Sequence, residues 1–222
     1  MPITIQPLEE ADIPTFVRIE LEAFRPHPRI PMLWPRGYTD DLYAFYEDHK
    51  NESYNDSEQR LVKAVDDETG EIVAASEWTF VLDAEMEAKK VPSDPNEQPP
   101  PNWPKDGNWG LRTFFRIAWE EWRRKVFAGK PYIELNILVT NPAFQGRGAG
   151  RHLLSWGCEQ ADKLGLPMCL ESTPAGLSLY ARFGFEVITV IKADMKQFGW
   201  NKPYDEEGAK RFWMTREPQR SA

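Results

Sequence analysis

Hydrophobic and polar residues alternate along the first half of the chain in patterns that predict both strands and helices. Short stretches with a two-residue period are typical of half-buried strands, and apolar residues that recur every three or four positions are typical of amphipathic helices. The turn sequence Asp67-Glu68-Thr69-Gly70 separates two such runs and indicates a hairpin. The patterns predict an edge strand, two helices and the two strands of this hairpin, at residues 3–7, about 9–24, about 40–50, 60–66 and 72–82.

The second half begins with an atypical segment. Residues 84–110 are rich in proline and acidic side chains, which favours a solvated loop or a partly disordered insertion. The periodicity then returns, and Gly129, Gly165 and Gly184 each mark the end of a helix. Helices and strands alternate here before a closing hairpin, at residues 111–128, 132–140, 148–164, 167–172, 175–183, 186–194 and about 210–216.

This order of elements predicts a single α/β domain over residues 1–222. Antiparallel strands come first and a strand–helix–strand unit follows, so we expect a mixed, mainly antiparallel central sheet flanked by helices. With 222 residues and 41% hydrophobic content, the chain suits one domain that carries a proline-rich insertion at about 84–110.

The net charge of −8 limits the classes of partner. It argues against nucleic acid or an anionic membrane as the main partner. An anionic cofactor would need local positive charge, for which Arg147, Arg151 and Arg182 are the candidates. The three histidines show no metal-ligand spacing, so we expect no metal. Neither a signal peptide nor an apolar segment of bilayer length is visible, and we expect a cytoplasmic protein in which Cys158 and Cys169 are buried apolar fillers.

The most informative segment joins the strand at 132–140 to the helix that follows it. Glycines at positions 146, 148 and 150 remove side chains where a ligand would approach the backbone, and the first N–H groups of the helix have no intrahelical partner. Such a turn binds phosphate. A P-loop would need Lys-Ser or Lys-Thr after the glycines, and a dinucleotide-binding turn would need a different glycine spacing.

The remaining pattern, Gln145-x-x-Gly148-x-Gly150, resembles the pyrophosphate loop of the GNAT superfamily of N-acetyltransferases. A second block, Leu179-Tyr180-x-x-x-Gly184-Phe185, is similar to another conserved block of that family and follows in the expected order. The resemblance covers about residues 132–190. It implies acetyl-CoA as co-substrate, a primary amine as acceptor, and direct attack of the amine in a ternary complex.

The resemblance also implies where CoA binds. In this family the sheet splays between its two central strands, here 132–140 and 167–172, and the pantetheine arm enters the gap. Relatives often have an asparagine at the position of Thr173, and this departure puts one usual contact in doubt. The implied cofactor contacts lie on the first central strand, the glycine loop and the second block: Leu138, Val139, Gln145, Gly146, Arg147, Gly148, Ala149, Gly150, Arg151, Thr173 and Arg182.

Acetylation needs a neutral amine, and only about one lysine-like amine in a thousand is neutral near pH 7. The resemblance implies Glu134 as the base that removes the proton and Tyr180 as the acid that protonates the leaving thiolate. It also implies the backbone N–H of Val139 as an oxyanion donor. On an ideal strand Glu134 shares a face with Asn136, opposite Ile133, Leu135 and Ile137.

Three further acidic residues on or near strands, Glu77, Asp83 and Glu171, are interpreted as solvated charges, with Glu77 or Glu171 as a candidate relay. Five aromatic residues fall on segments that line the acceptor pocket in relatives: Phe24, Trp34, Tyr43, Trp78 and Phe80.

The acceptor itself stays open. Aromatic side chains favour a partly apolar acceptor, the acidic balance favours a cationic small molecule, and a peptide amine is the alternative. The helix at 111–128 and the proline-rich insertion could form a lid or the surface of a homodimer. A non-catalytic acyl-CoA-binding regulatory module is the competing functional hypothesis.

Overall fold

One sheet organises the molecule. The computed structural model describes residues 2–219, without the side chains of residues 84, 86 and 88. In this part of the chain seven strands pair in the order β1-β2-β3-β4-β5-β7-β6; β4 and β5 are parallel and the other neighbours antiparallel. The mixed, mainly antiparallel sheet is therefore confirmed. In chain order β1 to β7 are Ile3–Pro7, Gln59–Asp66, Ile72–Val81, Tyr132–Thr140, Met168–Ser172, Glu186–Ile191 and Arg211–Arg216.

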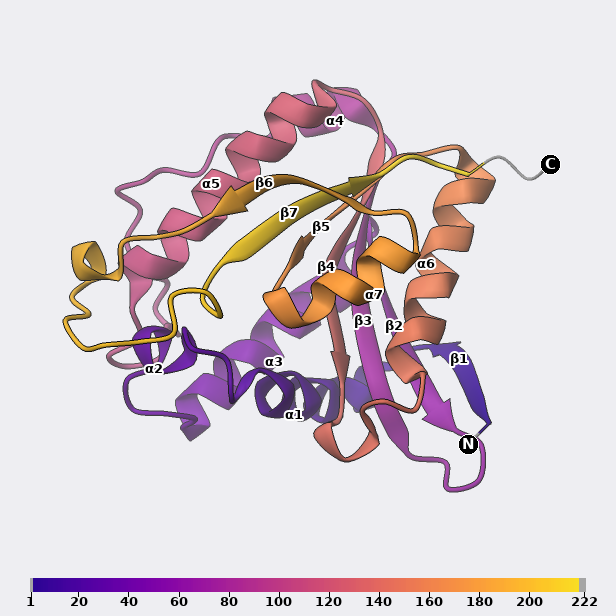
Figure 1. The fold of residues 1–222 in the computed structure, drawn as a ribbon, viewed down its shortest axis with the longest axis horizontal. Coiled ribbons are helices and arrows are strands. Elements are labelled where there is room, and N and C mark those ends of the chain that lie inside the picture. Colours follow the sequence, from indigo (N-terminus) through magenta and orange to yellow (C-terminus); the bar gives the residue numbers. More distant parts are fainter. Residues whose placement is uncertain (1, 220–222) are drawn as a thin grey trace.

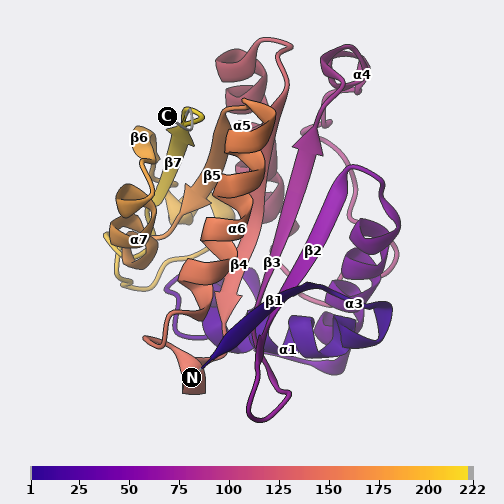
Figure 2. The ribbon, with the colours of Figure 1, turned by 90° about the vertical axis from the view of Figure 1, so that its right-hand side faces the viewer.

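Helices cover both faces of the sheet. Helices α6 and α7 lie on one face, and α1, α3 and α5 lie on the other (Figures 1 and 2). Short 3-10 turns precede or follow several elements, at Glu10–Asp12, Pro142–Phe144, Pro174–Gly176 and Met195–Phe198. In chain order α1 to α7 are Ile13–Phe24, Ile30–Leu33, Asp40–Asn55, Ala84–Lys89, Trp109–Phe127, Ala149–Leu164 and Leu177–Arg182.

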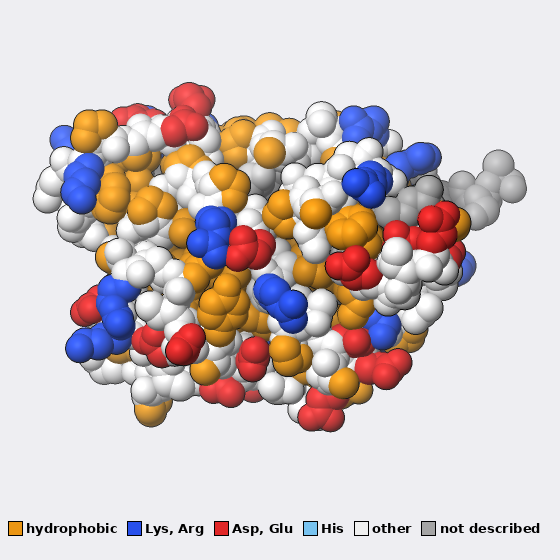
Figure 3. Space-filling view, turned by 90° about the horizontal axis from the view of Figure 1, so that it is seen from below, with side chains coloured by type: hydrophobic (Ala, Val, Ile, Leu, Met, Phe, Trp, Pro, Cys, Tyr) orange, Lys and Arg blue, Asp and Glu red, His pale blue; other side chains and the backbone are white. Residues whose placement is uncertain are grey.

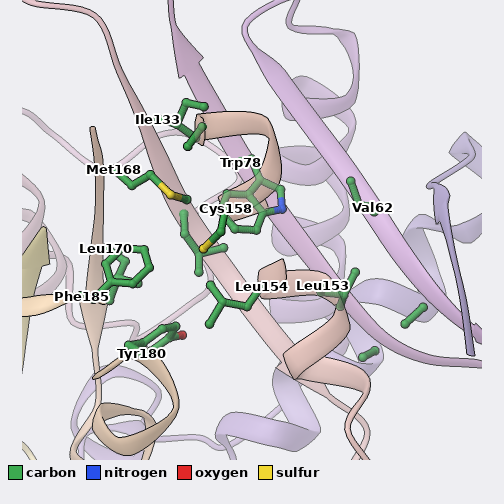
Figure 4. Close-up of a cluster of buried hydrophobic side chains, with 14 of the residues drawn as sticks. Val62, Trp78, Ile133, Leu153, Leu154, Cys158, Met168, Leu170, Tyr180 and Phe185 are labelled. Carbon is green, nitrogen blue, oxygen red and sulfur yellow. The ribbon is translucent and has the colours of Figure 1, made fainter. Parts of the chain in front are cut away.

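The core beneath α6 is built around Trp78 of β3. Its side chain is fully buried, and its indole nitrogen donates a hydrogen bond to Ser76 Oγ at 2.8 Å. Gly157 of α6 permits the contact, because a Cβ at this position would lie only 2.1 Å from the Trp78 ring. Figure 4 shows Trp78 among the side chains of Cys158, Leu153 and Leu154 on α6. Phe80 belongs to the same cluster, so Trp78 and Phe80, which were expected at an acceptor pocket, are both buried core residues on the α6 face.

An extra residue interrupts the alternation of β4. In the register with β3, Glu77 is opposite Ile137 and Trp78 is opposite Leu135, so Asn136 has no direct partner and forms a β-bulge. The bulge exchanges the two faces of the strand: Leu135 packs under α6, whereas Ile137 packs against the α1 side. The ideal alternation expected from the sequence therefore fails at Ile137.

The two central strands separate soon after they pair. The parallel register between β4 and β5 runs from Ile133 and Met168 to Leu135 and Leu170 and then ends, while β4 continues to Thr140. The end of β4 keeps its pairing with β3, so its other edge is open. The expected splay between these strands is confirmed.

The proline-rich segment packs against the domain, and most of it has no regular secondary structure. It begins with α4, which the sequence did not predict, and its Trp103 packs against Trp34 and Phe45 with ring centroids 5.0 and 5.1 Å apart. The Trp103 indole donates to the carbonyl of Gly107 at 3.0 Å. The segment thus packs on the first half of α3 and on the residue that follows α2.

The surface carries charges of both signs. Seen from below, acidic and basic side chains are interspersed with apolar ones and do not form a single charged field on this face (Figure 3). Among the residues that the structure describes, no helix combines the length and hydrophobicity needed to cross a bilayer.

Candidate active site

The splay between β4 and β5 opens into a cleft of about 420 Å³. The end of β4 forms one wall, and the glycine loop and the start of α7 form the other. The C-terminal end of α1 contributes Ala23 and Phe24. The lining residues are Ala23, Phe24, Leu135, Asn136, Ile137, Leu138, Val139, Thr140, Gln145, Gly146, Gly150, Glu171, Thr173, Ala175, Gly176, Leu179 and Tyr180.

The glycine loop presents a row of unpaired backbone donors beside this cleft. Among the hydrogen bonds of the described residues, none is donated by the backbone N–H groups of residues 146–151. Gly146 and Gly148 have φ values of +76° and +95°, which other residues adopt only with strain. Gly148 is the N-cap of α6, so the amides lie at the positive end of a sixteen-residue helix. The loop has the form of an anion-binding turn.

Positive side chains accompany the loop. Arg147 is exposed, with its guanidinium carbon 5.2 Å from the centre of the Phe144 ring, and Arg151 is exposed in the first turn of α6. Arg182 is exposed at the end of α7 and does not line the cleft. Of the residues predicted to contact the cofactor, those that line the cleft are Leu138, Val139, Gln145, Gly146, Gly150 and Thr173.

Tyr180 lies in the opposite wall. Its side chain is nearly buried, and burial raises the pKa of its phenol above the ordinary value. Gly176 makes room for the ring, since a Cβ there would come within 2.8 Å of it. Figure 4 shows the Tyr180 hydroxyl directed toward the side on which Leu154 of α6 lies. A neutral phenol is therefore held beside the cleft.

Glu134 has partners that compete with a role as base. Its carboxylate accepts hydrogen bonds from the Trp119 indole at 2.6 Å and from Arg123 at 2.5 Å, both on α5. It is buried on the α5 face and does not line the cleft. The base role implied by the resemblance stays a prediction, and these contacts do not favour it, because both carboxylate oxygens are held by side chains of α5 away from the cleft.

Glu171 of β5 is the carboxylate that lines the cleft, with a side chain 24% exposed. Burial raises the pKa of its carboxyl to about 7, although Arg29 and a 3.0 Å hydrogen bond from the Trp213 indole favour the ionised form. Arg211 of β7 also forms an ion pair with it. A carboxyl that titrates near neutrality is suited to general base catalysis. In the sequence, Glu171 is a charged residue directly after the apolar run Met168-Cys169-Leu170, and this position could have indicated a partly buried carboxylate.

A buried polar network reaches the cleft from the α3 side. Lys50 is 2% exposed and forms ion pairs with Glu20, at 3.0 Å, and with Glu77. Asn136, at the bulge, donates to Glu77 at 3.4 Å and lines the cleft. Glu77 is therefore not the solvated charge expected from the sequence, because a buried lysine neutralises it.

The remaining predicted site residues are dispersed. Trp34 is buried beneath the proline-rich segment, and Tyr43 is half-buried with its ring 6.5 Å from that of Tyr38. Neither lines the cleft, whereas Phe24 does. Both cysteines are buried and unbonded to each other. Within the described residues, no group of three or more His, Cys, Asp or Glu side chains is arranged to hold a metal ion.

Two comparisons with known proteins match part of the sequence. A family model described as an acetyltransferase (GNAT) domain matches residues 114–187. A curated relative, the probable acyltransferase SID5 of Ajellomyces capsulatus, is 44% identical over 52 residues, which is 22% of this chain and 38% of that protein. The match thus spans less than half of the relative, and acyl transfer is the chemistry that both matches support.

Solved structures share the fold over the whole chain. An acetyltransferase from Corynebacterium glutamicum, described as histone acetyltransferase HPA2 and related acetyltransferase, has a TM-score of 0.61 and 23% identity, covering 100% of this chain and 99% of its own. Arylalkylamine N-acetyltransferase 2 from Aedes aegypti has a TM-score of 0.65 and 17% identity, covering 99% and 100%. A PaiA N-acetyltransferase from Thermoplasma acidophilum, solved with coenzyme A, has a TM-score of 0.50 and 15% identity, covering 98% and 99%. Residues 114–187 thus match an acetyltransferase (GNAT) domain, and the chain as a whole shares the fold of solved acetyltransferases.

Proposed function

We propose that the protein transfers an acetyl group from acetyl-CoA to a primary amine by direct attack in a ternary complex. The observation that carries the proposal is the row of unpaired amides at residues 146–151, which borders a cleft between two splayed strands. Six consecutive donors at a helix N-terminus match the diphosphate of CoA.

The cleft next to that loop is where the pantetheine arm of CoA would lie in an extended conformation. The diphosphate would bind the amides, with Arg147 and Arg151 supplying the positive charge that the acidic chain otherwise lacks. The pantetheine amides would pair with the open edge of β4 near Leu138 and Val139. This path leads the thioester past Tyr180 toward Glu171.

Different groups that line the cleft would carry out the successive chemical steps. Glu171 takes a proton from the acceptor ammonium, and the nitrogen lone pair attacks the thioester carbonyl carbon. The N–H groups on the open edge of β4 belong to Leu138 and Thr140, because the register with β3 turns the N–H of Val139, the donor implied by the resemblance, toward β3. The N–H of Leu138 is therefore the candidate that stabilises the oxyanion. Collapse of the intermediate breaks the C–S bond, and Tyr180 protonates the leaving thiolate. The second proton lost from the nitrogen restores the phenol, and Glu171 releases its proton to solvent.

A pair of glycine variants tests the binding step. Gly146 and Gly70 have φ values of +76° and +73°, and a Cβ at either position meets no atom within 4 Å. Gly146→Asp and Gly70→Asp therefore impose the same backbone strain, but only the first places a carboxylate at the proposed diphosphate site. We expect Gly146→Asp to weaken acetyl-CoA binding at least about tenfold in calorimetry, because like charges repel. Gly70→Asp should bind as the wild type does.

Turnover is measured as release of CoA thiol over a panel of primary amines. Wild-type protein should release thiol with at least one of them, and Gly146→Asp should release it more slowly at low acetyl-CoA concentration. Equal affinity in Gly146→Asp and wild type would contradict the proposed site. Tight acetyl-CoA binding with no thiol release over the whole panel would instead support the acyl-CoA-binding module.

A further inference from the structure

Arg29, between α1 and α2, has a buried positive charge that the described residues do not satisfy. The residue is 7% exposed, and its Nε and Nη1 atoms are buried without a hydrogen-bond partner among those residues. Its guanidinium carbon lies 5.0 Å from the centre of the Phe115 ring of α5. An unpaired buried guanidinium destabilises the fold, so its presence here needs an explanation, and free donors that bind a ligand would provide one.

A second arginine converges on the same ring. Arg211 of β7 has its guanidinium carbon 3.8 Å from the centre of Phe115, and its Nε is also buried without a partner. Its Nη1 forms the ion pair with Glu171. Two guanidinium groups thus share the surroundings of one carboxylate that faces the cleft.

The charged side chains around Glu171 are more positive on balance than the chain as a whole. The carboxylate of Glu134 also interacts electrostatically with Glu171, but it already forms an ion pair with Arg123. Arg29 and Glu171 are close enough to influence each other electrostatically, although no ion pair joins them. Two cations, Arg29 and Arg211, therefore act on Glu171 from behind the lining of the cleft, within a protein whose net charge is −8.

We infer that the acceptor carries an anionic group in addition to the amine that is acetylated. Arg29 binds the anionic group, and Glu171 accepts the proton of the amine. This inference rests on the proposed acetyl transfer and narrows its substrate class. A guanidinium fork matches a carboxylate through two parallel N–H donors, and it binds a phosphate in the same way. The acceptor class is thus an amino acid or another amine with an acidic group, rather than the purely cationic amine favoured by the overall charge.

Acceptor pairs that differ only in the acidic group test this inference. Phenylalanine is compared with 2-phenylethylamine, ornithine with 1,4-diaminobutane, and phosphoethanolamine with ethanolamine. In wild-type protein we expect kcat/KM to be at least about tenfold higher for the acidic member of a carboxylate pair, as a charge-assisted hydrogen bond would give. A larger preference in the phosphoethanolamine pair would identify phosphate as the anionic group.

Two variants locate the effect. Arg29→Gln should abolish the preference by slowing the acidic member, while acetyl-CoA affinity in calorimetry stays unchanged. Arg25→Gln is the matched control, because Arg25 begins the same connection between α1 and α2 but is exposed and paired with Glu22 at 2.6 Å. It should retain the wild-type preference.

The outcomes separate the two proposals. Equal turnover within every pair, or faster turnover of the members without an acidic group, overturns the inference and leaves acetyl transfer standing. A preference that persists in Arg29→Gln also overturns it, since another residue would then hold the anion. Bound acetyl-CoA without turnover of any acceptor refutes acetyl transfer and the inference with it, and failure to bind acetyl-CoA refutes the proposed function at its first step.

Discussion

Replacing Lys50 by methionine tests whether the buried ion pairs beside the cleft stabilise the fold. Lys50 is 2% exposed and lies between Glu20 and Glu77, which are 5% and 3% exposed. Burial by itself would lower the pKa of Lys50 and raise that of Glu77. The pairing reverses both shifts, so that the pKa of Lys50 is raised and that of Glu77 is lowered from their ordinary values.

Methionine keeps an unbranched apolar side chain, but it lacks the ammonium group that lies 4.7 Å from the centre of the Phe16 ring, and it leaves two buried carboxylates without a cation. Removal of one partner from a buried ion pair costs about 3–5 kcal/mol. With a urea dependence of about 2 kcal/mol per molar, the midpoint of unfolding should fall by about 1.5–2.5 M. Tryptophan fluorescence during urea titration at pH 8 measures this shift.

Lys192→Met is the matched control. Lys192 pairs with Glu206, but these side chains are 52% and 56% exposed. An exposed pair contributes less than about 1 kcal/mol, so the midpoint should barely move.

The pH dependence supplies a second criterion. In the wild type the lowered pKa of Glu77 stabilises the fold above the unfolded-state pKa, and this contribution disappears as the pH falls through the folded-state value. In Lys50→Met the unpaired carboxylates have raised pKa values, so their penalty is greatest at high pH and is relieved when they protonate. The gap between variant and wild type should therefore shrink from pH 8 to about pH 5. A loss below about 1 kcal/mol at pH 8, or a gap that grows on acidification, would refute the reasoning.

Three other predictions concern the cleft and the core. Tyr180→Phe should lower kcat by about 10²-fold or more while the calorimetric affinity for acetyl-CoA stays unchanged, and an unaltered kcat would exclude Tyr180 as the acid. The rate should fall as the pH drops below about 7, because Glu171 must be ionised to accept a proton and burial raises its pKa to about 7; Glu171→Gln should remove this acid limb, and Glu134→Gln should retain it. Gly157→Ala should destabilise the protein by about 1–3 kcal/mol, since its Cβ would lie 2.1 Å from Trp78. Gly110→Ala on α5 is its control, with the nearest atom at 3.7 Å, and a thermal scan in which both variants melt alike would contradict the packing argument.

Hydrophobic periodicity and turn residues in the sequence were sufficient to predict most helices and strands. The strand expected at 132–140 coincides with β4, and the helix expected at 148–164 begins one residue later as α6. Gly165 ends that helix in the left-handed conformation, as its place in the sequence indicated. These features depend on periodicity and on backbone freedom, which a short stretch of sequence contains in full.

Errors arose where a second segment determines the outcome. Alternation could not reveal the bulge at Asn136, because an extra residue is defined only by the register with β3. The burial of Trp78 under α6 could not be predicted either, since an aromatic residue on a strand does not indicate which face of the sheet a helix covers. Helix α4 was missed within a segment whose composition favours a loop.

The sequence by itself determined the order of the elements and the glycine turn that begins α6, because glycine spacing and the start of a helix are properties of one continuous stretch. Only the tertiary structure decided which carboxylate faces the cleft. Glu134 is bound by α5, Glu77 is neutralised by α3, and Glu171 alone of these three lines the cleft, beside arginines from the α1–α2 connection and β7. The affinity of a carboxyl for a proton depends on burial and on neighbouring charges, and segments far apart in the chain supply both.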